Sequence, residues 1–311
     1  MKASVIIASW NRKKDTLETL ESLAKSTISD FCLEVVVVDN GSRDGSPEAI
    51  KELFKKIEKP PTILTKLIEN KENLGFAEGN NIGMRHALTH GADFIILLND
   101  DTMVDKNLIL NLIQGARLNK DAGILSPKIY FAKGFEFHKD RYKSQDLGKV
   151  IWSAGGDIDW DNVYATNHGV DEIDHGQFDK VRQIDFATGC CVLLKREVLK
   201  KISLFDTKYF AYFEDADLAQ RVKKGGWKVL FFPDAHLWHK VSQSSGIGSD
   251  LNDYFITRNR MLFGMRYASL RTKFALFRES LRLLVAGRRW QKTGIRDFYL
   301  GKFGRGSWPP A

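Results

Sequence analysis

Short apolar runs alternate with amphipathic segments in the first half of the chain, and this alternation predicts strands and helices in turn. Strands are expected at residues 4–8, 34–39, 62–68 and 94–98. Helices are expected after Asn11 as far as Lys25, from Ser46 onward, over 76–89 and over 106–118. A strand–helix order of this kind predicts an α/β fold with a mostly parallel, twisted sheet flanked by helices.

The most distinctive pattern is the apolar run Phe94–Leu98, which ends abruptly in Asn99, Asp100 and Asp101. A continuous apolar run suits a strand that is covered on both faces. Two adjacent carboxylates at its carboxyl end repel each other unless a divalent cation or the polar groups of a ligand lie there, and hard oxygen ligands suit Mg²⁺ or Mn²⁺. The alternative is a solvated turn that caps the following helix. The pattern alone leaves both readings open.

Polar clusters also follow the first two expected strands. They are Ala8-Ser9-Trp10-Asn11 and Asp39-Asn40-Gly41-Ser42. Because parallel strands end at the same edge of a sheet, we expect both clusters beside Asn99–Asp101, where ligands of open α/β sheets bind. Asp39 could accept a hydrogen bond from a pyrimidine imide or a ribose hydroxyl, or it could simply precede the turn at Gly41. The segment Asn73–Phe76 could lay backbone N–H groups near a phosphate or ribose.

The middle of the chain has a different character. Residues 128–185 are rich in Gly, Asp, His and aromatic residues and predict irregular hairpins and loops, the kind of insertion that can shape a binding pocket. Trp152, Trp160 and Tyr164 could stack on a sugar ring or pack beneath the insertion. Regular structure is expected again as strands at 190–194 and 227–232, a helix at 214–224, and helices from Asp250 onward.

Composition favours a soluble globular protein with a core large enough for an enzyme, since 43% of the 311 residues are hydrophobic and 28% are charged. The three cysteines lack a metal-ligand spacing, and their odd number disfavours a disulfide framework, so we expect a reducing cytoplasm. The apolar run at the amino terminus is too short for a signal peptide, and no run approaches the ~18 residues of a membrane span.

Positive charge is concentrated at the carboxyl end. The net charge is +8, and from Arg258 onward 13 Lys and Arg stand against 2 Asp and Glu, a balance of +11, which leaves −3 for the rest. Such a tail suggests an anionic partner. Its apolar and basic residues alternate in a helical pattern that could lie on an anionic membrane surface, pack on the catalytic domain or form the seam of a homodimer. The apolar members are Phe274, Leu276, Phe277, Leu281, Leu283 and Leu284, and the basic members are Arg271, Lys273, Arg278, Arg282, Arg288 and Arg289.

Six motifs in a fixed order resemble glycosyltransferase family 2 proteins of GT-A fold, in particular the branch that includes rhamnosyltransferases. The resemblance runs from about Ala3 to Val241 and more loosely to the end. The motifs are Val5–Asn11, Val36–Ser42, Asn73–Gly83, Leu97–Asp101, Phe213–Leu218 and Trp238-His239. Each motif is weak alone, and their common order makes the signal strong.

The resemblance implies an inverting, metal-dependent glycosyltransferase that uses dTDP-rhamnose or a UDP-sugar as donor and a cell-surface glycan or polyprenyl-lipid-linked acceptor. It implies that Asp101 and His239 hold Mg²⁺ or Mn²⁺. Asn99 stands where the family's acidic motif has an aspartate, which removes one charge and weakens the case for a ribose contact there. The residues matched to nucleotide binding are Ala8, Ser9, Asn11, Asp39, Asn73, Gly75, Asn80, Asn99 and Asp100.

The family places its general base at Glu214-Asp215. An acceptor hydroxyl must lose its proton as it attacks the anomeric carbon, and a nearby carboxylate can take that proton. We expect Asp215 to be the base and Glu214 to orient it or to bind an acceptor hydroxyl; the alternative is that Asp215 caps the following helix. Arg258, Arg260 and Trp238 are weaker candidates for contacts with a diphosphate or the acceptor.

These expectations divide the chain into a catalytic domain at 1–245, with a nucleotide-sugar half at 1–127 and an acceptor half at 128–245, and a basic helical region at 246–311. The expected location is the cytoplasm, at the inner face of the plasma membrane. A sugar-phosphate nucleotidyltransferase would carry a Gly-rich loop where this chain has Ser9–Arg12. The remaining alternatives are a catalytically silent nucleotide-sugar binding protein and a nucleic-acid binder acting through the tail, although we find no nucleic-acid motif and expect no nucleic-acid partner.

Overall fold

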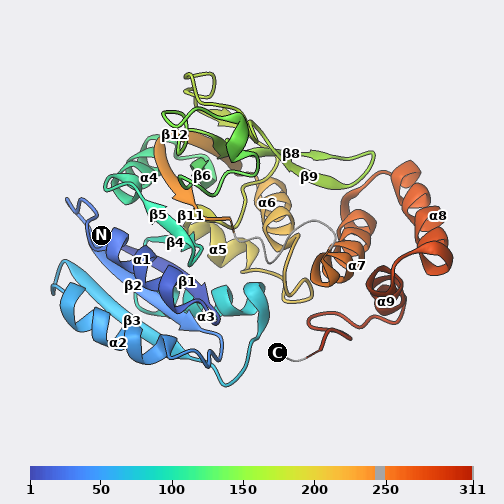
Figure 1. Ribbon diagram of the computed structural model, residues 1–311, viewed down its shortest axis with the longest axis horizontal. Helices are drawn as coiled ribbons and strands as arrows, with labels where there is room; N and C mark the ends of the chain where they lie inside the picture. Colours follow the sequence, from blue (N-terminus) through green and yellow to red (C-terminus); the bar gives the residue numbers. More distant parts are fainter. Residues whose placement is uncertain (242–248, 310–311) are drawn as a thin grey trace.

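A mixed β-sheet forms the centre of the molecule in the computed structural model, which describes residues 1–241 and 249–309. Its strands follow the order β10-β12-β6-β11-β4-β1-β2-β3, and helices cover both faces (Figure 1). The predicted α/β architecture is confirmed. The fold matters for function because it gathers the carboxyl ends of several strands at one edge.

The first part of the sheet is parallel, as the sequence predicts. Strand β1 pairs in parallel with β2 and with β4, and β2 pairs in parallel with β3. The strands are β1 (Lys2–Ser9), β2 (Cys32–Asp39), β3 (Ile63–Glu69) and β4 (Phe94–Leu98), and the helices between them are α1 (Lys13–Leu23), α2 (Ser46–Ile57) and α3 (Gly75–Thr89). Side chains that alternate along β1 and β2 enter two apolar clusters, one under α3 and the other under α1 and α2. The register aligns Ser9 with Asp39, so both lie at the same edge.

In the second part of the sheet, strand β11 (Cys191–Lys195) runs opposite to both of its neighbours. It lies antiparallel between β4 and β6 (Ala122–Phe131), and β12 (Lys228–His239) runs parallel to β6. The short strand β5 (Thr102–Val104) pairs antiparallel with the end of β12. Helix α4 (Leu108–Leu118) precedes β6, α5 (Arg196–Ile202) follows β11, and α6 (Glu214–Lys224) precedes β12.

The short strand β5 is not among the expected strands, and the longer strands β6 and β12 differ from the sequence prediction in extent. Strand β6 continues to Phe131, into the segment expected to be irregular, and the predicted division at 127/128 falls within it. Its apolar pattern is interrupted by buried polar residues such as Lys128, whose ammonium bonds Asp174 and Asp179 at 2.8 and 2.6 Å, so periodicity did not reveal the strand. Strand β12 extends beyond Phe232 to His239 because a register irregularity at Phe232 lets it pass Pro233 and pair again with β6.

The middle segment contains the short strands β7 (Ile151–Ser153), β8 (Gly156–Asp159), β9 (Tyr164–Asn167) and β10 (Arg182–Gln183). Strands β8 and β9 form a predicted hairpin, whereas β7 pairs with β6 and β10 with β12. Three helices follow at the carboxyl end: α7 (Asp250–Tyr267), α8 (Leu270–Ala286) and α9 (Arg289–Tyr299). Helices α8 and α9 lie at the end of the molecule remote from α2 and β3 (Figure 1). The predicted boundary at 245/246 lies outside the described residues. Within those residues, no helix combines the length and hydrophobicity needed to cross a membrane.

Candidate active site

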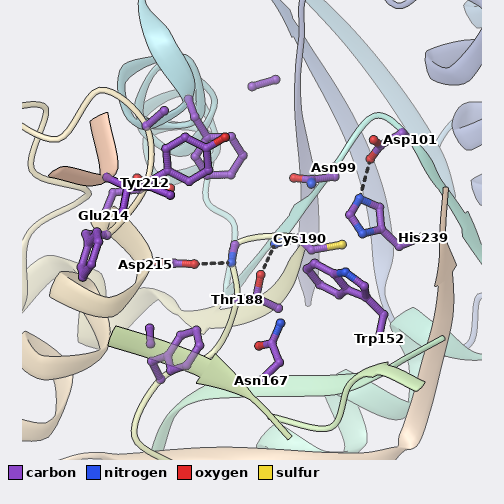
Figure 2. A pocket seen from close by; sticks show the side chains of 18 of the residues that line it. Asn99, Asp101, Trp152, Asn167, Thr188, Cys190, Tyr212, Glu214, Asp215 and His239 are labelled. Atoms are coloured by element: carbon purple, nitrogen blue, oxygen red, sulfur yellow. Dashed lines mark hydrogen bonds and ion pairs between the residues drawn. The ribbon is translucent and has the colours of Figure 1, made fainter. Parts of the chain in front are cut away.

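A cavity of 530 Å³ opens at the carboxyl edge of the sheet and brings together residues from both halves of the chain. Asn99 and Asp101 follow β4, His239 ends β12, and Glu214 and Asp215 begin α6. Figure 2 shows the Asp101–His239 pair on one side of this cavity and Glu214 with Asp215 on the other. Two acidic groups that lie far apart in the sequence therefore face a common space.

Asp101 and His239 form a buried pair. The Nε2–H of His239 donates to Asp101 Oδ1 over 2.9 Å, and Arg12 Nη1 lies 3.3 Å from Asp101 Oδ2. Burial alone would raise the pKa of Asp101, but the hydrogen bond and charge of His239, together with the charge of Arg12, lower it. Asp101 is therefore an anion at neutral pH, as a metal ligand must be.

The neighbouring carboxyl behaves differently. Burial, and then repulsion by Asp101, raise the pKa of Asp100 to about 7. Two adjacent anions are thus costly at this edge unless a positive charge is added. Such a cost of holding two anions is expected at a site that binds a cation or a cationic group.

The residues of this edge fit a divalent cation only with help from a ligand. His239 bonds Asp101 through Nε2, and its Nδ1 is buried and has no hydrogen-bond partner within residues 1–241 and 249–309, so in the neutral imidazole Nδ1 is an unused acceptor. Across those same ranges, no three His, Cys, Asp or Glu side chains gather closely enough to hold a metal ion by themselves. Two protein ligands suit Mg²⁺ or Mn²⁺, which are commonly held by few side chains together with phosphate oxygens and water.

Asp215 is held in a fixed orientation at the start of α6. Its Oδ2 accepts from the Gly189 N–H over 3.0 Å, and its Oδ1 accepts from the Ala216 N–H over 2.7 Å. Burial raises the pKa of Asp215 despite these bonds. The helix begins after Phe213, so Asp215 lies in the first turn and does not occupy the cap position suggested by the alternative reading.

Glu214 is the more deeply buried of the two carboxyls. Its Oε2 has no hydrogen-bond partner among the described residues. Burial, and then the charge of Asp215, raise the pKa of Glu214 well above its usual value. The two carboxyls therefore titrate as one pair, in which burial and the charge of Asp215 favour the protonated form of Glu214.

The loop that precedes this pair is strained and is clamped by α7. Phe210, Tyr212 and Phe213 all have positive φ angles, of 64°, 68° and 73°. The Asn259 amide donates to the carbonyls of Tyr209, Ala211 and Tyr212 over 2.7–2.9 Å. The sequence gives no periodic signal for such a clamp, because it depends on a contact between residues about 50 positions apart.

A second site lies at the end of β2. Asp39 Oδ2 accepts from the N–H groups of Gly41 and Ser42 over 3.1 and 2.9 Å, while its Oδ1 is buried and has no partner within the described chain. Gly41, whose backbone N–H bonds Asp39, also lines an adjacent groove of 220 Å³. The groove is lined by Trp10, Asn11, Gly41, Arg43, Lys71, Glu72, Asn73 and Arg305. An unsatisfied carboxylate oxygen beside a groove can recognise an N–H or O–H group of a ligand.

Most residues singled out from the sequence line one of these two hollows. Those that line the cavity are Ala8, Asn99, Asp100, Asp101, Glu214, Asp215 and His239, and those that line the groove are Asn11 and Asn73. Ser9 and Asp39 lie buried at the same strand edge, where the Ser9 hydroxyl bonds that of Thr16. The predicted convergence of the three strand ends is thus present in the structure.

Five further candidates do not line either hollow, for identifiable reasons. Asn80 donates within α3 to the Phe76 carbonyl, and Gly75 packs against Phe210. Trp238 alternates with His239 along β12, so it lies on the opposite face and donates to the Gly148 carbonyl. Arg258 and Arg260 form hydrogen bonds with other parts of the chain.

Arg258 and Arg260 tie α7 to its neighbours. The buried Arg258 guanidinium donates to the carbonyls of Lys208 and Tyr209 over 3.3 and 3.1 Å. Arg260 forms a bidentate pair with Glu279 and lies over the ring of Tyr164, 4.4 Å from its centroid. Neither guanidinium reaches the cavity as a diphosphate ligand, although Arg260 supports a residue that lines it.

Sequence reasoning missed several residues that line the cavity. They are Arg12, Phe76, Asn167, Thr188, Gly189, Cys190, Tyr212 and Ile256. Of the three aromatics that could either pack or contact sugar, Trp152 and Tyr164 line the cavity, whereas Trp160 stacks on Phe263 in the core. Trp152 also packs edge-on against His239, with ring centroids 4.6 Å apart. An aromatic wall near polar groups is typical of a carbohydrate or nucleotide pocket.

Comparison with known sequences identifies the family. The model of "Glycosyl transferase family 2" matches residues 4–203. The N-acetylglucosaminyl-diphospho-decaprenol L-rhamnosyltransferase of Mycobacterium tuberculosis is 26% identical over 222 residues, which cover 69% of this chain and 68% of that protein. The galactofuranosyltransferase GlfT2 of the same species is 21% identical over 271 residues, covering 83% of this chain and 40% of that protein.

Solved structures agree on the fold. The mannosyltransferase PcManGT of Pyrobaculum calidifontis, in complex with GDP-Man and Mn²⁺, superposes with a TM-score of 0.55 at 16% identity, covering 96% of this chain and 74% of that one. GalNAc-T7 with UDP, GalNAc and Mn²⁺ superposes with a TM-score of 0.60 at 18% identity, covering 90% of this chain and 55% of that one. The chain is a member of glycosyltransferase family 2, a glycosyltransferase of GT-A fold that is similar to rhamnosyltransferases.

Proposed function

We propose that this glycosyltransferase is inverting and metal-dependent, and that it transfers a sugar from dTDP-rhamnose or a UDP-sugar to a hydroxyl of a lipid-linked or cell-surface glycan. One observation carries the proposal: the anionic Asp101 with His239, and the acid pair Glu214-Asp215, line the same cavity. A nucleotide-sugar binding protein without activity would need Asp101 and His239 but not Glu214 and Asp215.

The donor would lie along the strand edge. The unpaired Oδ1 of Asp39 is available to the N–H of a pyrimidine base, since both thymine and uracil carry an imide donor. Asp101 and His239 would hold Mg²⁺ or Mn²⁺ on the donor diphosphate. When bound, the cation would neutralise the charge that develops on the leaving nucleoside diphosphate.

Asp215 is suited to act as the base. Its carboxylate is fixed by two backbone N–H groups, and its raised pKa brings it closer to that of an effective proton acceptor at neutral pH. It would take the proton of the acceptor hydroxyl while the hydroxyl oxygen bonds the anomeric carbon and the diphosphate leaves from the opposite face. Because burial and the charge of Asp215 raise the pKa of Glu214, its protonated form would donate a hydrogen bond within the cavity.

The acceptor is proposed from the relatives. One relative is named for transfer to N-acetylglucosaminyl-diphospho-decaprenol, so a polyprenyl diphosphate acceptor is the first choice to test. A panel of nucleotide sugars should be screened for Mn²⁺- or Mg²⁺-dependent release of nucleoside diphosphate, with and without such an acceptor. Donor-specific release that is lost in Asp215→Asn and retained in Asp250→Asn supports the proposal, because Asp250 lies in the first turn of α7 outside the cavity. Binding of a nucleotide sugar without release would identify a silent binding protein instead.

A further inference from the structure

The outward side of α8 carries a stripe of apolar side chains that are exposed to solvent in the described structure. Leu270, Phe274, Phe277, Leu281 and Val285 are each between 42% and 84% exposed. At about 100° per residue, these five positions fall within an arc of roughly 80° on the helix surface. A contiguous exposed apolar stripe of this kind marks an interaction surface.

Basic residues border the stripe. Arg271, Arg278 and Arg282 are exposed and, by the same geometry, occupy an adjoining arc of roughly 40°. The opposite side of α8 is occupied by the protein core, where Leu276 is buried and Leu283 is partly buried, while Leu284, at the edge of the stripe, also packs against the main apolar cluster. The structure thus separates the apolar residues of this segment into a packing set and an exposed set, which the sequence alone could not do.

We propose that this face of α8, defined by the five apolar residues and the three arginines, docks on an anionic phospholipid bilayer. A helix with a narrow apolar side and flanking arginines lies in the plane of an interface, with the apolar side chains among the acyl chains and the guanidinium groups at the phosphates. Charge argues against a second copy as the occupant. Pairing two such stripes would bring the arginine rows, and two tails of +11 each, close together.

An ion pair and a cation–π contact link α8 to the cavity wall. Glu279 of α8 accepts both arms of the Arg260 guanidinium over 2.8 and 2.9 Å, and that guanidinium lies over Tyr164, which lines the cavity. A docked α8 would therefore hold the cavity close to the membrane surface. If the proposed lipid-linked acceptor is correct, this arrangement delivers its membrane-anchored sugar to the enzyme, but docking itself does not depend on the donor or the acceptor.

Co-sedimentation with vesicles tests the proposal without any nucleotide sugar. The intact protein should bind vesicles of phosphatidylcholine mixed with phosphatidylglycerol, and binding should fall as NaCl is raised and be weak on phosphatidylcholine alone. The double variant Phe274→Glu/Leu281→Glu should bind at least about tenfold more weakly. Replacing Arg271 or Arg282 by Ala should weaken binding by about fivefold each. Leu118→Glu is the matched control, since Leu118 is 80% exposed on α4, and it should bind like the wild type.

Thermal unfolding of each variant establishes that the fold is intact, which is expected because all substituted side chains are exposed. Wild-type protein that does not sediment with anionic vesicles at low salt would overturn the proposal. Equal binding by the Phe274→Glu/Leu281→Glu variant would overturn it too, by assigning docking to another surface. So would a solution dimer that this variant dissociates, because α8 would then be a dimer seam. Failure to find a donor would leave these results unaffected.

Discussion

His239 Nε2 lies 2.9 Å from Asp101 Oδ1, although 138 positions separate the two residues in the chain. The sheet brings them together, because β5 and β12 pair antiparallel with Thr102 opposite His239, and the Lys240 N–H bonds the Asp101 carbonyl over 2.8 Å. The pair is therefore positioned by backbone hydrogen bonds on both sides. Small rearrangements of the loop after β4 cannot separate it easily.

Loss of this pair should abolish the effect of the metal. In Asp101→Asn, binding of the nucleoside diphosphate product should become independent of Mn²⁺, because the anionic ligand is gone, and His239→Ala should weaken the Mn²⁺ effect by about 10–100-fold. Isothermal titration with and without EDTA measures this. His236→Gln is the matched control, since His236 lies on the same strand and is 3.7 Å from Asp105, outside the cavity. Unchanged Mn²⁺ dependence in Asp101→Asn would rule out Asp101 as a ligand.

The two acids of α6 should respond differently to amide substitution. Asp215→Asn should reduce transfer by about 10²–10⁴-fold, the usual contribution of a general base, while the donor dissociation constant changes little. Glu214→Gln should lose much less, because Gln resembles the protonated Glu214 that burial favours. Initial rates and donor binding by fluorescence quenching separate the two effects. The reverse order of losses would exchange their roles.

The pH profile should show the ionisation of Asp215. Because burial raises the pKa of Asp215, and the protonated form cannot accept a proton, kcat/KM should fall as the pH drops, with a midpoint above the usual range of an aspartate. Measurements with Mn²⁺ at saturation keep metal binding out of the profile. In Glu214→Gln this fall of kcat/KM at low pH should persist. Its disappearance would show that the titrating group is Glu214.

The clamp formed by Asn259 should contribute to catalysis through position. Asn259→Ala removes one donor from each of three loop carbonyls, of which Tyr209 keeps its bond from Arg258; this should cost about 1–3 kcal/mol of stability and lower kcat with little change in donor affinity. The comparison of kcat with donor affinity distinguishes displacement of Asp215 from general unfolding. Asn111→Ala serves as control, because the Asn111 amide likewise donates to a backbone carbonyl, that of Asp234, and neither residue lines the cavity. Equal effects of both substitutions on kcat would contradict a positioning role.

Two glycines at the ends of α3 should differ in their tolerance of a side chain. Both have φ near +85°, but a Cβ on Gly75 would lie 2.5 Å from Phe210, whereas a Cβ on Gly91 would meet nothing within 4 Å. Gly91→Ala should therefore cost about 1–2 kcal/mol from backbone strain alone, and Gly75→Ala about 2–4 kcal/mol. Urea unfolding at neutral pH gives both values. A cost for Gly75→Ala no larger than that for Gly91→Ala would show that Phe210 moves to make room for the added methyl group.

The sequence was most informative where local signals coincide with tertiary structure. Strands β1, β2 and β4 are predicted because each contains a continuous apolar run, and the polar residues that follow them lie at one edge as expected. Strand β6 was missed because it buries Lys128 against two aspartates 46 and 51 positions away, a compensation that no local pattern reveals. Arg258 is only a weak candidate for a diphosphate or acceptor contact from the sequence, and in the structure its guanidinium bonds backbone carbonyls distant in the sequence.

The clamp of Arg258 and Asn259 on the loop before α6 has a consequence for how this enzyme can be altered. Two adjacent residues of the last third of the chain bond the carbonyls of Lys208, Tyr209, Ala211 and Tyr212, which lie just before the acids of the cavity. The carboxyl-terminal helices are therefore not a detachable module. A chimera that takes this region from another glycosyltransferase would also need the loop before α6 from that same protein, because the helix and the loop bond each other.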